Sequence, residues 1–222
     1  MSEIDRCLVL ASGSPRRLEL LRQLGGAFTV QVSGVPEPID DRLRPAENVL
    51  AIARAKAEAI SLTAGDCLVL AADTDVVLDG EILGKPLDAA DARQMLRRLQ
   101  GRAHEVLTAV VVVDPVSGDR REEVVSSSVV IRDLSDDEID AYVATGEPLD
   151  KAGGYAIQGE AASMGGSGVG CYTNVVGLPI CAAQKLGLTA FDADLQIERA
   201  PRGAVRAHAL KVAERQIGRA HV

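Results

Sequence analysis

The sequence predicts an α/β protein in which helices pack on a central sheet, and three observations lead to this prediction. Strand-like and helix-like segments alternate from the beginning of the chain, as in layered α/β folds. The continuous apolar runs at 7–11 and 67–72 are typical of buried strands, and segment 46–62 carries apolar residues at helical spacing. The composition of the 222 residues, 47% apolar and 25% charged, fits one or at most two globular domains.

The first part of the chain alternates strand and helix. The strand at 7–11 leads into a helix at 15–24, because Pro15 fits a first helical position, where its missing N–H is harmless. A strand at 28–32 and a proline-bearing loop come next. The helix at 46–62 follows, with an apolar stripe on one face.

A hairpin and a further helix follow the strand at 67–72. The Asp79-Gly80 pair lies between two short apolar segments, so it predicts a hairpin over 76–83. The segment 88–99 has helical periodicity and stops before a glycine.

Two long strands and two short helices complete the pattern. The strands at 106–113 and 124–131 are joined by a short loop, which predicts an antiparallel pair. Ser135 opens a capping-box match and a helix that runs through Ala144, and another short helix is expected at 182–186.

The charge of the chain restricts its partners. The sum of 24 basic and 32 acidic residues gives −8, and only five aromatic residues are present, so we expect neither nucleic-acid nor membrane binding. Any anion site must be local.

A domain is expected over 1–190, followed at 191–222 by a basic extension that is poorly ordered or helical, with a nucleic-acid-binding arm as the alternative.

The cysteines are expected to be buried, reduced thiols. They are far apart, with no neighbouring histidine, so a structural zinc site is not expected. The cysteines are Cys7, Cys67, Cys171 and Cys181.

The acidic N-terminus and the short first apolar run favour a cytoplasmic protein without a signal peptide or membrane span.

The segment from Ser12 to Arg17 lies between a strand and a helix, where free backbone N–H groups attract anions. Arg16 and Arg17 in the first turn oppose the helix dipole, so a bound triphosphate would compensate their charge and accept bidentate hydrogen bonds. The alternative is that both arginines are solvated residues of a surface helix.

The second candidate stretch places Asp73 at the end of the strand 67–72. This carboxylate is either a metal ligand or base, or an ordinary turn former. Because oxygen donors dominate, Mg²⁺ or Mn²⁺ suits the site better than zinc, with Glu37 as a second ligand. Lys85 follows the hairpin and could lie at the same edge of the sheet. Lys56 is on a helix rich in alanine, where a lysine is more often a solvated surface residue than a ligand.

Two glycine-bearing stretches follow. In 150–159 the glycines permit close backbone approach and Gln158 offers a donor and an acceptor to a nucleobase, although a bulged strand is the alternative. The segment 174–179 reads as a strand that ends in a turn.

Together these stretches resemble the Maf family of nucleoside triphosphate pyrophosphatases over about 8–188. The resemblance rests on the ordered motifs Leu10-Ala11-Ser12-Gly13-Ser14-Pro15-Arg16-Arg17, Ala72-Asp73-Thr74, Gly84-Lys85-Pro86, Met95-Leu96-Arg97-Arg98-Leu99, Leu149-Asp150-Lys151-Ala152-Gly153, Gly154-Tyr155-Ala156-Ile157-Gln158-Gly159 and Val176-Gly177-Leu178-Pro179. It implies a two-lobed, ITPase-like α/β fold with a mixed central sheet and a substrate cleft between the lobes. It also implies metal-dependent hydrolysis of a nucleoside triphosphate between its α- and β-phosphates, by a homodimer.

The resemblance also implies the roles of individual residues. Asp73 would be the proton acceptor for the attacking water and, with Glu37, would hold the metal. The positions that the family uses for phosphate and metal are Ser12, Arg16, Arg17, Glu37, Lys56 and Lys85. Arg16, Thr74 and Gln158 match the branch that acts on dTTP and UTP, which makes modified pyrimidine triphosphates plausible substrates in a housecleaning role. The small-residue segment 161–170 departs from the family pattern, and the alternative function is a non-catalytic nucleotide-binding regulator linked to division or septation.

Overall fold

The computed structural model describes residues 6–23, 27–157 and 166–188, so the extension expected at 191–222 and Gln158 lie outside the described residues. The strands are β1 (Leu8–Leu10), β2 (Thr29–Val30), β3 (Leu68–Leu78), β4 (Glu81–Leu83), β5 (Ala103–Val113), β6 (Arg120–Ile131) and β7 (Gly166–Val169). The helices are α1 (Pro15–Gln23), α2 (Pro45–Ser61), α3 (Ala89–Leu99), α4 (Asp136–Ala144), α5 (Tyr172–Val176) and α6 (Ile180–Lys185), with 3-10 turns η2 (Glu147–Asp150) and η3 (Ala152–Gly154).

The seven strands form one mixed sheet in the order β2-β1-β3-β5-β6-β7, with β4 paired to β3. β1 is parallel to both β2 and β3, whereas β4 runs antiparallel to β3 and β7 antiparallel to β6. β5 and β6 are neighbours, as expected from the short loop that joins them. The α/β prediction with a mixed sheet is therefore confirmed.

The described chain divides into two compact units. Among the described residues, the first unit comprises 6–23, 27–75, 107–126 and 173–188, and the second comprises 76–106, 127–157 and 166–172. Each unit therefore contains part of β3, β5 and β6.

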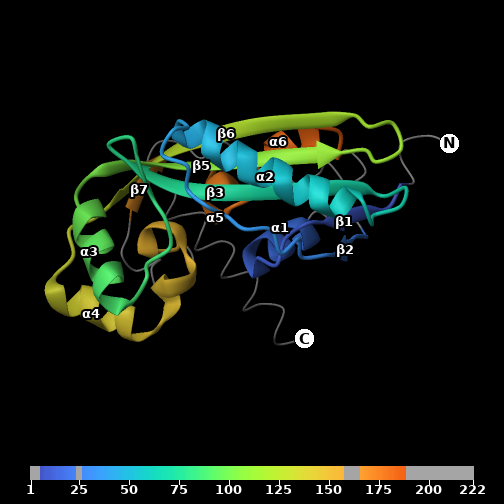
Figure 1. Cartoon of the computed structure of the whole chain (residues 1–222). Coiled ribbons are helices and arrows are strands. Elements are labelled where there is room, and N and C mark those ends of the chain that lie inside the picture. The colour runs from blue at the N-terminus through green and yellow to red at the C-terminus, as the bar shows by residue number, and fades with distance from the viewer. Residues whose placement is uncertain (1–5, 24–26, 158–165, 189–222) are drawn as a thin grey trace. The chain divides into compact units, whose positions relative to one another are not determined.

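The core of the first unit forms around β1, β3 and α2. Val49, Ala53 and Ala57 lie on one face of α2 at four-residue spacing and are fully buried, in keeping with the apolar stripe of that segment. Figure 1 shows α2 lying along the sheet in this unit. Burial of a side chain such as Val49 contributes about 1.5–3 kcal/mol.

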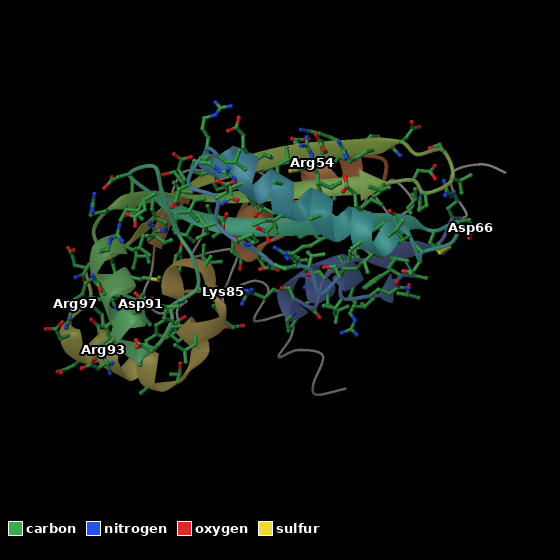
Figure 2. All side chains as sticks on the ribbon, in the orientation of Figure 1. Arg54, Asp66, Lys85, Asp91, Arg93 and Arg97 are labelled. Carbon is green, nitrogen blue, oxygen red and sulfur yellow. A yellow bond between two sulfur atoms is a disulfide. The ribbon has the colours of Figure 1, made fainter. Side chains whose placement is uncertain are left out.

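In the second unit, α3 and α4 contact each other. Asp88 caps α3 by accepting from the Asp91 backbone N–H, and Ser135 caps α4 within the predicted capping box. Arg93 and Arg97 on α3 pair with acidic residues of α4 (Figure 2), and the Arg97 pair with Asp136 has an N to O distance of 2.7 Å. These pairs are exposed, so each contributes little to stability.

Two local expectations are wrong. Asp73 does not follow a strand but lies inside β3, which continues to Leu78, because a neighbouring cation compensates its charge in the buried strand. The segment 172–176 is the helix α5 instead of a strand. Backbone N–H groups of Gly177 and Leu178 return to the Thr173 carbonyl, and Gly177 supplies the positive φ of 119° that closes the turn.

The prediction of four buried, reduced cysteines is also wrong. Cys7 and Cys67 form a disulfide with a Cα to Cα distance of 4.7 Å. They precede Leu8 and Leu68, which are partners in the parallel register of β1 and β3, so the pairing of the strands brings the two thiols together. Cys7 and the free Cys181 are exposed, whereas Cys67 and Cys171 are half-buried.

Within the described ranges, no helix is both long and apolar enough to cross a bilayer.

Candidate functional site

The loop between β1 and α1 positions the first group of candidate residues. α1 begins at Pro15 as expected, and the Leu18 N–H donates to the Ser14 carbonyl over 3.1 Å. The buried Ser12 hydroxyl accepts from the Ser14 N–H at 3.2 Å. Because Pro15 fixes the helix start and Ser12 fixes the turn before it, the first helical turn has a defined position.

Arg17 leaves this turn and is buried, with 9% of its surface exposed. Its Nε donates to the Gly177 carbonyl at 2.7 Å, Nη1 to Ser12 Oγ at 3.3 Å and Nη2 to Thr74 Oγ1 at 2.9 Å. The solvated-helix alternative is therefore wrong for Arg17, whereas Arg16 is half-buried.

The electrostatics of Arg17 link it to the acidic candidates. Burial lowers the pKa of the Arg17 guanidinium, Asp73 and Glu37 oppose that change, and Arg16 adds to it. The sequence predicts that a bound anion compensates the positive charge of the two arginines. The chain's own carboxylates already supply part of that compensation.

Lys56 holds the two candidate carboxylates together. It lies on α2 with only 6% of its surface exposed, so the expectation of a solvated lysine is wrong. Its Nζ is 2.6 Å from Asp73 Oδ1 and 2.6 Å from Glu37 Oε1. The Asp73 side chain is buried and the Glu37 side chain is 40% exposed, so the cluster extends from the interior to solvent.

These residues form one cationic neighbourhood in an acidic chain. Arg16, Arg17 and Lys56 carry three positive charges against the two negative charges of Glu37 and Asp73, which leaves a net charge of one positive. A local positive charge of this kind attracts a polyphosphate even where the whole chain carries −8.

Behind Arg17 lies a chain of hydroxyl groups that the sequence analysis missed. Thr74 Oγ1 is 2.9 Å from Thr108 Oγ1, and Thr108 donates to the Asn174 carbonyl at 3.0 Å. A signal existed, because Thr108 is the one hydroxyl residue between the apolar positions 106–113 of β5. Its partners, however, are distant in sequence.

For two candidates the role in the site stays a prediction. Lys85 follows β4, belongs to the second unit and is exposed. Gln158 lies outside the described residues. The cluster therefore comprises Ser12, Arg16, Arg17, Glu37, Lys56, Asp73 and Thr74.

In the second unit, the residues that precede Gln158 are anchored to β5. His104 Nε2 lies 2.6 Å from the Tyr155 hydroxyl, and the two rings meet edge to face with centroids 5.4 Å apart. Burial lowers the pKa of His104 to about 4 and raises the pKa of Tyr155 above its usual value. The imidazole is therefore neutral at pH 7.

The donor set suits a hard divalent cation. Glu37 and Asp73 already converge on one cation, the Lys56 ammonium, and carboxylate oxygens are the ligands that Mg²⁺ prefers. Two carboxylates are enough where substrate phosphates and water complete an octahedron. In the part of the chain that is described, the one group of three possible metal-ligating side chains is Cys7, Asp66 and Cys67, and its two thiols are joined to each other.

Comparison with known proteins gives consistent matches. The family model described as Maf-like protein matches residues 7–188. A dTTP/UTP pyrophosphatase of Moorella thermoacetica is 49% identical over 188 residues, 85% of this chain and 96% of that protein. One of Anaeromyxobacter dehalogenans is 52% identical over 181 residues, 81% of this chain and 91% of that protein. Among solved structures, the Staphylococcus aureus Ham1 protein aligns at 19% identity and a TM-score of 0.41, covering 58% of this chain and 73% of that chain.

Proposed function

Because the chain belongs to the Maf-like family, we propose that it is a nucleoside triphosphate pyrophosphatase that hydrolyses dTTP and UTP to the monophosphate and pyrophosphate. The observation that carries this proposal is the burial of Arg17 beside the cluster of Lys56, Asp73 and Glu37. A cationic group fixed next to a paired carboxylate is the arrangement that hydrolysis of a phosphate anhydride needs.

Each group in the first unit has a task in this reaction. Arg16, Arg17 and the first turn of α1 bind the phosphates, and the arginines stabilise the charge that grows on the departing pyrophosphate. Asp73 accepts the proton of the water that attacks the α-phosphorus, while the bond to the bridging oxygen breaks. Lys56 holds the Asp73 carboxylate in one orientation through its 2.6 Å contact.

Glu37 and Asp73 are the residues that would hold Mg²⁺ or Mn²⁺. When bound, such an ion supplies neutralisation of phosphate charge. The pairing of both carboxylates with Lys56 supports this assignment.

Arg16, Thr74 and Gln158 are proposed to favour the pyrimidine nucleotides. Thr74 contacts Arg17, which suggests that it acts on the phosphate-binding guanidinium and not only on the base. Modified nucleotides such as 5-methyl-UTP belong to the same proposal, as does a housecleaning role in nucleotide metabolism. A cytoplasmic location and a homodimer complete the proposal, and light scattering would test the homodimer.

A substrate panel tests this function. The purified protein is incubated with dTTP, UTP, 5-methyl-UTP, dCTP, dATP and GTP, with Mg²⁺, with Mn²⁺ or with a chelator, and the products are separated by ion exchange. We expect the monophosphate and pyrophosphate from the thymine and uracil nucleotides, and no turnover with the chelator. Release of orthophosphate, or tight binding of nucleotide without turnover, would overturn the proposal, the latter in favour of a binding regulator.

Two variants of helix α2, one at the site and one as its matched control, extend that panel. Lys56→Gln should abolish turnover, because Asp73 and Glu37 lose their shared partner. Arg54→Gln, on the same helix (Figure 2), removes the pair with Glu122 and should leave turnover unchanged. Equal turnover in both variants would contradict the proposed role of Lys56 in orienting Asp73.

A further inference from the structure

The Thr108 side chain is fully buried in β5, between apolar residues of the same strand. A valine has almost the same shape as threonine, so packing alone does not require a hydroxyl group here. Burying a hydroxyl is unfavourable unless it is hydrogen-bonded. Thr108 meets this condition through two contacts, with Thr74 Oγ1 at 2.9 Å and with the Asn174 carbonyl at 3.0 Å.

The direction of these hydrogen bonds follows from counting protons. A threonine hydroxyl has one proton to donate, and the Asn174 carbonyl can only accept, so Thr108 donates to Asn174. Thr108 must then accept from Thr74. The Thr74 oxygen in turn has its lone pairs available to accept from Arg17 Nη2 at 2.9 Å. The chain therefore runs in one direction, from Arg17 through Thr74 and Thr108 to Asn174.

The chain closes on itself through the backbone. Asn174, which accepts from Thr108, lies three residues before Gly177, whose carbonyl accepts from Arg17 Nε at 2.7 Å. The same turn thus holds the guanidinium directly at one edge and, through two hydroxyl groups, at another. All of these residues belong to the first unit.

We propose that Thr108 is a positioning residue for Arg17. It orients the Thr74 hydroxyl so that the oxygen faces the guanidinium, and this fixes the plane in which Arg17 meets the phosphates. The inference rests on the proposed function for its catalytic consequence, but the positioning itself does not depend on it. Without the Thr108 acceptor, the Thr74 proton would turn toward other partners and the guanidinium would lose its fixed acceptor.

Two substitutions test the hydroxyl separately from the packing. Thr108→Val keeps the volume and removes the acceptor, and we expect kcat/KM for dTTP to fall about tenfold, mainly in kcat, because charge on the departing pyrophosphate grows in the transition state. Thr108→Ser keeps the hydroxyl and should stay within about threefold of the parent protein. Loss of activity in Thr108→Ser equal to that in Thr108→Val would overturn the proposal.

Val110→Ala is the matched control. Val110 is fully buried on the same strand and has no polar contact, so its truncation lowers the melting temperature while leaving kcat and KM within about twofold. If Thr108→Val falls no further in kcat/KM than Val110→Ala, its effect is one of stability and the positioning role is wrong.

A measurement without substrate separates this inference from the proposed function. The Arg17 Nη2–H resonance, assigned by its loss in Arg17→Lys, should exchange with solvent about fivefold faster in Thr108→Val than in Thr108→Ser or the parent protein, because Nη2 is the donor to Thr74. Unchanged exchange in Thr108→Val would overturn the positioning role. Faster exchange in a protein that hydrolyses no nucleoside triphosphate would leave the positioning role standing and overturn the proposed function alone.

Discussion

Lys56 Nζ lies 2.6 Å from Asp73 Oδ1, and this buried pair joins the helix α2 to the strand β3. Glu37 Oε1 approaches the same nitrogen at 2.6 Å from the loop before α2. One ammonium therefore fixes two carboxylates from separate elements, and removal of Lys56 leaves the buried Asp73 charge without this cation.

Lys56→Met should lower the free energy of unfolding by about 3 kcal/mol, because Asp73 then keeps a buried charge without the cation. Urea unfolding at pH 7 measures the change. Arg54→Met, which breaks a partly solvated pair with Glu122, should cost less than about 1 kcal/mol. The double variant Lys56→Met, Asp73→Asn should recover much of the loss; a purely additive double variant would show that the two groups do not interact energetically.

Asp73→Asn should reduce turnover about a hundredfold or more while the protein stays folded, because the amide oxygen still accepts from Lys56 but cannot take the proton of water. Initial rates with dTTP and a thermal melt measure the two properties. Asp66→Asn, at an exposed position of the same unit, is the control and should retain full activity. Substantial turnover in Asp73→Asn would assign proton acceptance to another group.

Replacing both Cys7 and Cys67 by serine should lower the free energy of unfolding by about 2–4 kcal/mol, since the disulfide closes a loop of 60 residues in the unfolded chain. A reductant should lower the melting temperature of the parent protein and leave the double variant unchanged. Cys181→Ser should change little. A parent protein indifferent to reductant would mean that the bond does not form in solution.

His104 should make stability depend on pH. Its pKa in the folded protein is lowered from 6.5 to about 4 by burial, so the unfolded chain takes up the proton first as the pH falls. The stabilisation is complete above pH 6.5 and is lost as the pH approaches 4, a difference of about 3 kcal/mol. His104→Gln should flatten this slope in urea unfolding, whereas Tyr155→Phe should keep it. Equal slopes in all three proteins would contradict the prediction.

Local chemistry was enough to predict much of the fold. The capping box at Ser135 needs only neighbouring residues, and so does the hairpin turn at Asp79-Gly80, where both residues have positive φ. The continuation of β3 through Asp73 could not be predicted in this way. A charged residue ends a buried strand unless a partner from elsewhere compensates it, and that partner, Lys56, becomes visible only in the packed structure.

The site was predictable in its residue types and less so in its connections. The resemblance to the Maf family pointed to Arg17, Asp73 and Lys56 as site residues. The structure brings these three side chains into one neighbourhood. Thr108 was missed because a single threonine in an apolar strand is common, and what distinguishes it here is a contact with Thr74 across the sheet. The disulfide was missed because it depends on the register of β1 against β3.

The three hydrogen bonds that hold Arg17 also affect the entropy of recognition. A free arginine side chain samples many rotamers, and freezing them on contact with a ligand is unfavourable by about 2 kcal/mol. Here Ser12, Thr74 and Gly177 immobilise the side chain when the protein folds. The guanidinium has therefore already lost its rotamer entropy before an anion binds. Less of the favourable interaction energy is offset by ordering, and the affinity for the anion is higher.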